Sequence, residues 1–281
     1  MSHFNILSHW SFWLATIRPT IFTMKSKITS TRYKKEPVTF SEIGDVRYLH
    51  FGTPWVQGAM NMRRPFKLEL EYARMMMAYL LFMDAPKKVA QLGMGCASLT
   101  KFTYKYLPHT HSTVVELNPD VIAACYGMFR LPMDERIDVV QADAAQWIAE
   151  QVGVFDVLQI DLYDASARGP VCDSVAFYTD CFNALKDTGM ATINLVGDQR
   201  SFEKNMRQLK QALNQRVIAL PEIHEGNRIA LAFKGASIHL DWAELYARAD
   251  TAKGDYALPA KRWVSALKSV CSGHSSDGFK I

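Results

Sequence analysis

The stretch from Lys87 to Glu116 limits the possible folds of this chain more than any other part of it. It contains a buried apolar segment, a turn with Gly93 and Gly95, a helical segment from Ser98 and a second apolar segment that ends on an acid. Glycine lets a backbone turn sharply and come close to a ligand, and the following helix directs its free N–H groups to the same place. We interpret the stretch as the first half of a nucleotide-binding α/β unit.

Glu116 follows Gly95 by 21 residues (116 − 95). Folds of this kind place near that spacing a carboxylate that accepts hydrogen bonds from ribose hydroxyls. A glycine turn alone is weak evidence, because such turns often carry glycine for packing. The strand, turn, helix and acid together favour a bound nucleoside over a packing role alone.

Strands and helices alternate after Glu116 with short connections, which predicts a mainly parallel sheet with helices on both faces. Further strands are expected at 137–141, 155–160, 189–195, 216–220 and 229–233. Ligands of parallel sheets bind at the carboxyl ends of the strands. Because Glu116, Asp143 and Asp161 each lie at such an end, we expect them to converge on one crevice, although each alone could be an ordinary helix N-cap.

The sequence DLYD places Asp161 and Asp164 beyond the ribose, where the reactive end of a cofactor would lie. Two carboxylates there suit a cationic substrate. A primary amine is protonated in water and must lose a proton before it attacks carbon, and a nearby carboxylate can orient the amine and help to remove that proton. The alternative is that Asp164 caps a turn and Asp161 merely ends its strand.

Charge and cysteine spacing argue against several classes of protein. The formal charge is +4, but residues 1–37 contain six Lys or Arg against Glu36, a local +5, so the remainder carries −1 (4 − 5). We therefore expect no nucleic-acid surface. No apolar run approaches the roughly 20 residues of a membrane span. The five cysteines form no CxxC pair, which argues against a structural metal site and is typical of a reducing cytoplasm.

The N-terminal part of the chain divides at Val38. Residues 1–36 combine an apolar piece with a Lys/Arg/Ser/Thr stretch and lack the features of a secretory signal. We expect a disordered leader, with Met24 as an alternative start. VTFSEI and VRYLHF, joined at Gly44 and Asp45, then predict a β-hairpin.

Gln57 lies in a third extended piece, residues 55–60. It is either an edge-strand glutamine facing water, which the sequence favours, or an amide that binds a ligand. A helix is expected from Leu68 to Phe82, and the chain after Gly235 predicts one more helix followed by a polar tail. The expected domains are a leader (1–36), a β-strand domain (37–66), a nucleoside-binding domain (67–250) and a C-terminal tail (251–281).

Six short motifs in a fixed order carry a family resemblance over about residues 38–234: TPWVQGAM, LELEYARMM, LGMGCASL, VVELNPDV, QADAAQW and DLYD. The chain resembles the spermidine synthases, which are polyamine aminopropyltransferases, and more closely their proteobacterial spermidine synthase-like branch. The resemblance implies an α/β, Rossmann-like methyltransferase fold preceded by a small N-terminal β-hairpin domain. It also implies a homodimer that uses decarboxylated S-adenosylmethionine as donor and a diamine such as putrescine as acceptor.

The resemblance also implies roles for individual residues. Asp161 would act on the reacting amines as the catalytic residue, and Asp164 and Tyr72 would bind the polyamine acceptor. The nucleoside of the donor would be bound by Gln57, Gly93, Gly95, Glu116 and Asp143.

Two departures from the family pattern bear on the donor. Members of the family have an aspartate in the glycine loop where this chain has Cys96, and a His or Gln followed by Glu where it has Ala73 and Arg74. Loss of that aspartate removes a charge-assisted hydrogen bond worth about 1.5–3 kcal/mol and a negative charge that would repel a carboxylate. Intact S-adenosylmethionine is therefore less excluded, and the alternatives are an S-adenosylmethionine-dependent methyltransferase and a noncatalytic nucleoside-binding relative.

Overall fold

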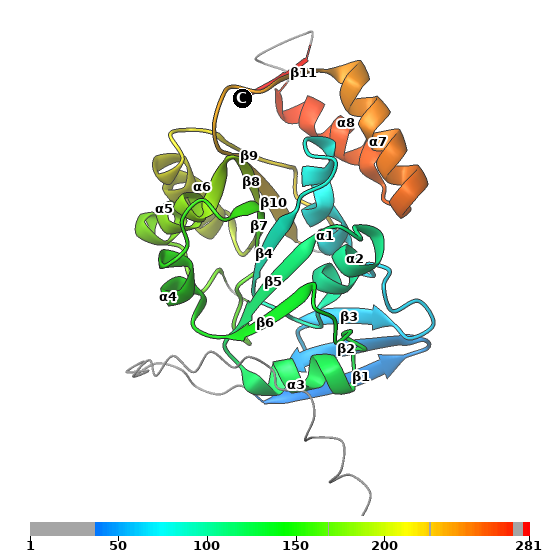
Figure 1. Cartoon of the computed structure of the whole chain (residues 1–281). Coiled ribbons are helices and arrows are strands. Elements are labelled where there is room, and N and C mark those ends of the chain that lie inside the picture. The colour runs from blue at the N-terminus through cyan, green and yellow to red at the C-terminus, as the bar shows by residue number, and fades with distance from the viewer. Residues whose placement is uncertain (1–36, 168, 225, 272–277) are drawn as a thin grey trace, which may run out of the picture. The chain divides into compact units, whose positions relative to one another are not determined.

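The computed structural model describes residues 37–167, 169–224, 226–271 and 278–281. The leader expected at residues 1–36 lies outside these ranges. The described chain contains a large sheet with helices on both faces and a smaller N-terminal sheet (Figure 1).

The large sheet has seven strands within the described residues, in the order β6-β5-β4-β7-β8-β10-β9. Neighbouring strands from β4 to β8 are parallel, and β10 pairs antiparallel with β8 and with β9. The mainly parallel sheet that the sequence predicts is thus confirmed. The strands are β4 (Lys88–Leu92), β5 (His111–Glu116), β6 (Ile137–Gln141), β7 (Phe155–Ile160), β8 (Leu185–Val196), β9 (Val217–Ala219) and β10 (Asn227–Phe233).

Successive residues of the central strands supply cores on opposite faces of the sheet. Val157 of β7 packs in a cluster that includes residues of the C-terminal helices, whereas Leu158 packs with residues of α4, α5 and α6. Because neighbouring side chains of a strand point in opposite directions, a strand covered on both faces is apolar throughout. The helices of this unit are α2 (Ser98–Tyr106), α3 (Pro119–Gly127), α4 (Ala144–Ala149), α5 (Val175–Ala184) and α6 (Gln199–Ala212).

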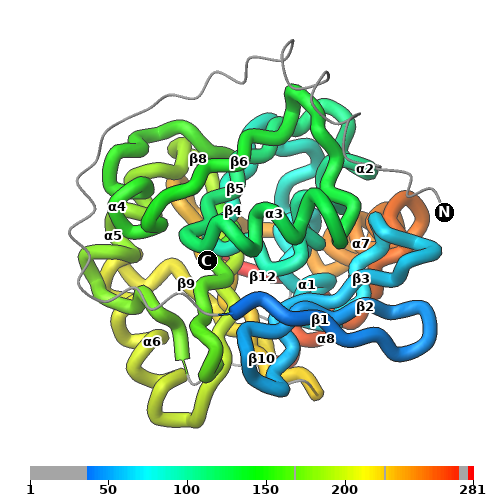
Figure 2. The backbone as a smooth tube through the Cα atoms, turned by 90° about the horizontal axis from the view of Figure 1, so that it is seen from below, coloured from blue at the N-terminus to red at the C-terminus, as the bar shows by residue number. Residues whose placement is uncertain are grey.

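The N-terminal sheet contains the predicted hairpin. β1 (Val38–Ile43) pairs antiparallel with β2 (Val46–Phe51), and β2 pairs with β3 (Gly58–Asn61). Gly44 in the turn has φ +59°, which a residue without Cβ adopts easily. Figure 2 shows α3 running beside β1, and Arg47 of β2 donates to the carbonyl of Met128 over 2.7 Å. The small sheet is therefore fastened to the end of α3.

The helix predicted from Leu68 to Phe82 is shorter and of two kinds. α1 (Glu71–Met75) is an α-helix, and Met76–Leu81, labelled η1, is a 3₁₀ helix whose six residues are all buried. Short 3₁₀ segments are common at the ends of α-helices. A buried amide of the large sheet contacts this one, because Gln159 donates to the carbonyl of Met76 over 3.2 Å.

The predicted C-terminal tail over 251–281 is wrong for the described residues. α7 (Trp242–Tyr256) runs past residue 251, α8 (Ala260–Cys271) follows it, and β11 (His239–Asp241) pairs with β12 (Gly278–Lys280). α8 buries Ala260, Trp263, Val264 and Leu267, a spacing that forms one apolar face of a helix. Among the residues that the structure describes, no helix combines the length and apolarity that a membrane span requires.

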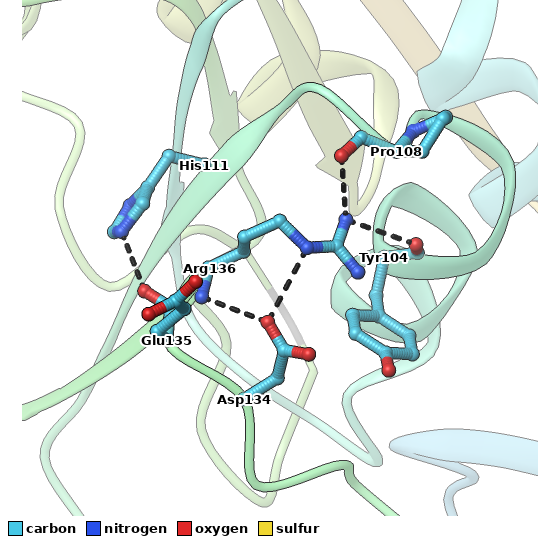
Figure 3. Close-up of polar contacts among 6 residues, drawn as sticks. All are labelled: Tyr104, Pro108, His111, Asp134, Glu135 and Arg136. Atoms are coloured by element: carbon cyan, nitrogen blue, oxygen red, sulfur yellow. Dashed lines mark hydrogen bonds and ion pairs between the residues drawn. The ribbon is translucent and has the colours of Figure 1, made fainter.

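Arg136 joins the end of α2 to the segment before β6 (Figure 3). Its guanidinium donates to the carbonyls of Tyr104 and Pro108 over 3.3 and 3.1 Å, contacts Asp134 at 3.3 Å and lies 4.4 Å from the Tyr104 ring centroid. His111, at the start of β5, donates from Nε2 to the carbonyl of Glu135 over 2.8 Å. These contacts join the amino ends of β5 and β6, far from the carboxyl ends of the two strands.

Candidate active site

The carboxyl ends of β4, β5 and β7 lie side by side, because these strands are parallel neighbours. The loops that follow them continue the pairing: Gly93 donates to the carbonyl of Val115 over 3.0 Å, and the Asp161 amide donates to the carbonyl of Leu92 over 2.9 Å. The Ala142 amide, after β6, donates to the carbonyl of Glu116 over 3.1 Å. The sheet edge therefore holds the glycine loop, Glu116 and Asp161 in adjacent positions.

Gly93 and Gly95 both have positive φ angles, +91° and +51°. A Cβ atom at Gly93 would overlap the carbonyl oxygen of Asp161, and one at Gly95 would lie 3.0 Å from the carbonyl oxygen of Gln57. Close approach of Asp161 therefore requires glycine at position 93, whereas the contact at position 95 is tight without overlap. The sequence interpretation attributed them to the approach of a ligand, and the structure adds this second reason.

Glu116 is tied to the glycine loop. Its Oε2 accepts from the Met94 amide over 3.2 Å, and its Oε1 accepts from the Asn118 amide over 2.8 Å. Burial raises the pKa of the Glu116 carboxyl, and these backbone N–H groups partly offset that shift. A carboxylate oxygen can accept more than one hydrogen bond, so each oxygen retains capacity for a ribose hydroxyl.

Asp143 is the N-cap of α4. Its Oδ1 accepts from the amides of Ala145 and Gln146 over 2.8 and 3.3 Å. Of the three acids that the sequence places at strand ends, this one has the ordinary capping role that was considered for each. Within the described chain, Oδ2 of Asp143 makes no hydrogen bond, so this oxygen is free to accept one.

Asp161 lies at the carboxyl end of β7 and is held by two side chains. Asn194 of β8 donates to its Oδ1 over 2.8 Å, and Tyr72 of α1 makes a hydrogen bond with it. Burial raises the pKa of the Asp161 carboxyl, and both hydrogen bonds partly offset that shift. Tyr72 and Asp161, which are 89 residues apart (161 − 72), are thus brought together by the fold.

Asp164 is exposed, and its Oδ1 accepts from the amide and the hydroxyl of Ser166 over 2.8 and 2.6 Å. Oδ1 of Asp164 therefore caps a turn, as the alternative interpretation of the sequence expects. The same loop is held by the segment before β3, because Gln57 donates to the carbonyl of Asp164 over 3.3 Å and Thr53 to that of Ala165 over 3.0 Å. Gln57 is half-buried and hydrogen-bonded to this loop, so the prediction of an edge-strand glutamine that faces water is wrong.

Tyr163, Asn194 and Asn227 form a hydrogen-bonded group that reaches Asp161 through Asn194, and the sequence assigns them no role. The Tyr163 hydroxyl donates to the carbonyl of Asn194 and accepts from the Val196 amide, both over 2.7 Å. Asn227 donates to the Asn194 side chain over 2.8 Å. The signal that could have found Asn194 is an amide within the otherwise apolar segment MATINLV.

Cys96 is 2% exposed and lies beneath β3. Its Sγ is 3.0 Å from the Ser98 hydroxyl and 3.4 Å from the carbonyl of Ala59, and a Cβ at Gly58 would lie 2.8 Å from it. The side chain therefore fills space under the small sheet. Among the described residues, no group of three or more His, Cys, Asp or Glu side chains is placed to hold a metal ion.

A cavity of about 650 Å³ lies apart from this arrangement. None of the residues predicted for the site lines it. Its charged lining residues are Glu69, Glu71, Arg74, Lys253, Lys261 and Arg262.

Comparison with known proteins gives the family. No protein-family model matches the chain. The chain is 33% identical to a polyamine aminopropyltransferase of Neisseria meningitidis over 234 residues, which are 83% of this chain and 89% of that protein. It is 32% identical to the one of Chromobacterium violaceum, again over 234 residues, 83% of this chain and 90% of that protein.

A solved structure shows the same fold. A probable spermidine synthase from Corynebacterium glutamicum superposes with a TM-score of 0.66 at 18% identity, covering 81% of this chain and 90% of that one. The family assignment rests on the sequence identity to the curated relatives, which extends over most of both chains, and not on the shared fold. The chain belongs to the polyamine aminopropyltransferase family.

Proposed function

We propose that this protein transfers an aminopropyl group from decarboxylated S-adenosylmethionine to a diamine such as putrescine and releases 5′-methylthioadenosine. The observation that carries the proposal is the position of Asp161: a half-buried residue at the carboxyl end of β7, next to the glycine loop and bonded to Tyr72 and Asn194. Membership of the family gives the reaction, and this geometry supports its assignment to these residues.

The nucleoside part of the donor is assigned to the first half of the sheet. In the proposal Glu116 accepts hydrogen bonds from the ribose hydroxyls, and the second oxygen of Asp143 accepts from the adenine amino group. The bonds from Met94 and Asn118 to Glu116 support its role, because they fix the carboxylate beside the glycine turn. Gly93, Gly95 and Gln57 would complete this part of the site.

The chemical step is assigned to Asp161. Its carboxylate binds the protonated acceptor amine and receives a proton from it, which frees the nitrogen lone pair. The nitrogen then attacks the carbon bonded to the donor sulfonium, so that a C–N bond forms while the C–S bond breaks and its electron pair passes to sulfur. A carboxylate whose pKa burial has raised is a stronger base for this proton transfer than an exposed one.

Tyr72 and Asp164 are assigned to the acceptor. Tyr72 bonds to Asp161 from α1 and so borders the place where the amine would react. Asp164 is exposed, and the second oxygen of its carboxylate can attract the far ammonium group of a diamine. The proposal further includes a homodimer and a cytoplasmic location. All five cysteines, which fall within the described residues, are free thiols, and this supports a reducing compartment.

One observation favours a second function. Cys96 replaces the glycine-loop aspartate and lies beneath β3, so residue 96 offers no negative charge to the donor. An S-adenosylmethionine-dependent methyltransferase on the same scaffold is therefore the second candidate. Calorimetric titration with both donors, with and without putrescine, separates the two. Tighter binding of the decarboxylated donor, strengthened by putrescine, supports aminopropyl transfer, and preferred binding of the intact donor supports methyl transfer.

The role of Asp161 is tested by Asp161→Asn. Turnover should be lost while the affinity for methylthioadenosine is kept, because the amide keeps the size of the side chain and loses its basicity. Asp138→Asn is the matched control, since Asp138 lies on β6 with a side chain that is 60% exposed. Unchanged turnover in Asp161→Asn would remove Asp161 from the mechanism.

A further inference from the structure

Asn194 and Asn227 form a chain of hydrogen bonds that ends on Asp161. Nδ2 of Asn227 donates to Oδ1 of Asn194 over 2.8 Å, and Nδ2 of Asn194 donates to Oδ1 of Asp161 over 2.8 Å. Asn194 is 4% exposed and Asn227 is 6% exposed. Buried amides satisfy their polar atoms inside the protein, so this pairing has no competition from bulk water.

The strand register places the three residues next to one another. Asn194 of β8 is opposite Ile229 of β10, and Asn227, two residues before Ile229, points to the same face. On the other side of β8, Ile193 pairs with Ile160, the residue before Asp161. The chain of amides therefore crosses from the antiparallel part of the sheet to the end of β7.

The chemistry of a carboxylate fixes the direction of this chain. An ionised Asp161 only accepts hydrogen bonds, so Asn194 has to present its NH₂ group to it. The amide oxygen of Asn194 then faces Asn227, which has to donate. If Asn227 no longer donates, the Asn194 amide can turn over and present its oxygen to the carboxylate. A change at Asn227 therefore reaches Asp161 through the orientation of the Asn194 amide.

Tyr163 fixes the backbone of the same residue. Its hydroxyl donates to the carbonyl of Asn194 and accepts from the amide of Val196, each over 2.7 Å. With the backbone held in this way, the remaining freedom of Asn194 is rotation of its side chain. The bond from Asn227 removes that freedom.

We propose that Asn227 is a positioning residue: through Asn194 it holds the Asp161 carboxylate in the orientation that receives the proton of the acceptor amine. This inference rests on the proposed function, because it assigns Asp161 the role of base. Asn227 acts through another residue and is not a catalytic residue itself.

The test replaces Asn227 by leucine, which has the same number of side-chain heavy atoms in the same branched shape and donates no hydrogen bond. We expect kcat for aminopropyl transfer to fall about ten- to a hundredfold, as is typical when the partner that orients a functional group is lost. The KM of the donor and the Kd of methylthioadenosine should stay within about twofold of wild type, because the nucleoside residues lie on other strands. If the leucine variant does not fold, Asn227→Ala takes its place, with the same expected changes in kcat, KM and Kd.

Asn205→Leu is the matched control. Asn205 is an asparagine that is 1% exposed and also bonded at both ends, donating to the carbonyl of Ser201 and accepting from the Tyr178 hydroxyl, each over 2.9 Å. It lies on α6 and makes no contact with Asp161. Its variant should lose stability and keep kcat within about twofold of wild type.

A second measurement follows Asp161 without turnover, by titration of its side-chain carboxyl in ¹³C NMR spectra. Among the described residues, the titratable groups that face Asp161 are the phenols of Tyr72 on α1 and of Tyr163 in its own loop. The amide of Asn194, which does not titrate, also contacts the carboxylate. Since the bond from Asn194 lowers the pKa of Asp161, loss of Asn227 should move the titration to higher pH, and Asn205→Leu should leave it in place.

The outcomes separate the two proposals. A kcat for Asn227→Leu within twofold of wild type, or an equal loss of kcat in the control, overturns the positioning role. A parallel weakening of methylthioadenosine binding also overturns it, because the defect would then be general. If the wild-type protein transfers no aminopropyl group, the proposed function fails, and the ¹³C titration alone decides whether Asn227 orients Asp161.

Discussion

Gly93 lies so close to Asp161 that a Cβ atom on residue 93 would overlap the Asp161 carbonyl oxygen. The backbone of the glycine loop thus rests directly on the first residue of the loop that carries the acidic groups. The position of the proposed base and the shape of the nucleoside turn depend on each other, because neither segment can shift without the other.

Gly93→Ala is expected to reduce both stability and turnover. The new Cβ meets a backbone atom that cannot rotate away, and φ is +91°, so the cost should be about 2 kcal/mol or more. Urea unfolding and kcat measure the two effects. Gly153→Ala is the control: its φ is +63° and no atom lies within 4 Å of the added Cβ, so only about 1 kcal/mol should be lost and turnover kept. Equal losses in both variants would contradict the contact with Asp161.

Ala257→Gly is expected to stabilise the protein by about 0.5–1 kcal/mol. Ala257 is exposed and closes α7 with φ +54°, a left-handed conformation that glycine adopts without strain. Thermal or urea unfolding measures the gain. Ala123→Gly, at an exposed position inside α3, should instead cost about 1 kcal/mol, because glycine weakens a helix interior. A loss at both positions would show that the left-handed cap carries no strain.

The stability of Asp161→Asn relative to wild type is expected to increase with pH. Burial raises the folded-state pKa of Asp161. The stability contributed by its protonated form is therefore complete below the ordinary carboxyl pKa and is lost as pH rises through the raised value. The asparagine variant has no such loss. Urea unfolding of both proteins from about pH 4 upward measures the difference, and parallel curves would contradict it. Turnover of the variant should fall by about two to four orders of magnitude.

Asp156→Asn should show the opposite dependence on pH. Burial alone would raise the pKa of Asp156, but the bond from Lys186 over 2.7 Å and the backbone amides of Lys87 and Lys88 outweigh it, so the pKa is lowered. Its stabilisation is present above the ordinary carboxyl pKa and lost as pH falls through the lowered value. We expect a cost of about 1 kcal/mol near neutral pH that disappears in acid. A cost that persists in acid would mean that packing, not charge, is lost.

Arg136→Lys is expected to cost about 1–2 kcal/mol although the charge is kept. The guanidinium serves two carbonyls, a carboxylate and a ring at once, and an ammonium group lacks this planar fork (Figure 3). Arg63→Lys is the control, because the Arg63 side chain is 79% exposed and its ion pair among the described residues is with Asp45, so its change should be near zero. Chemical unfolding of the two variants compares them directly, and equal values would contradict the specific role of Arg136.

Local chemistry explains what could be predicted from the sequence. The glycine turn, the β-hairpin and the acids at strand ends are set by neighbouring residues and by the alternation of strands and helices, so their positions followed from the pattern. The hairpin is an example, since Gly44 in its turn has φ +59° and β1 pairs with β2. The mainly parallel pairing of the large sheet followed from the same alternation.

Contacts between distant parts of the chain could not be predicted in this way. The bond between Asn194 and Asn227 depends on the register of an antiparallel pair, which no local pattern specifies. The bond from Gln159 of β7 to the carbonyl of Met76 likewise joins residues that are 83 apart in the sequence. α8 is different, because its apolar spacing is a local pattern that the sequence contains.

The hydrogen bonds from Thr53 and Gln57 to the carbonyls of Ala165 and Asp164 give the N-terminal sheet influence over the acidic loop. These donors lie outside the large sheet, and their acceptors are main-chain atoms that every amino acid possesses. The amino acids at positions 164 and 165 can therefore change while both hydrogen bonds from the N-terminal part are kept. The N-terminal part of the chain thus sets the course of this loop and leaves open which side chains the loop carries.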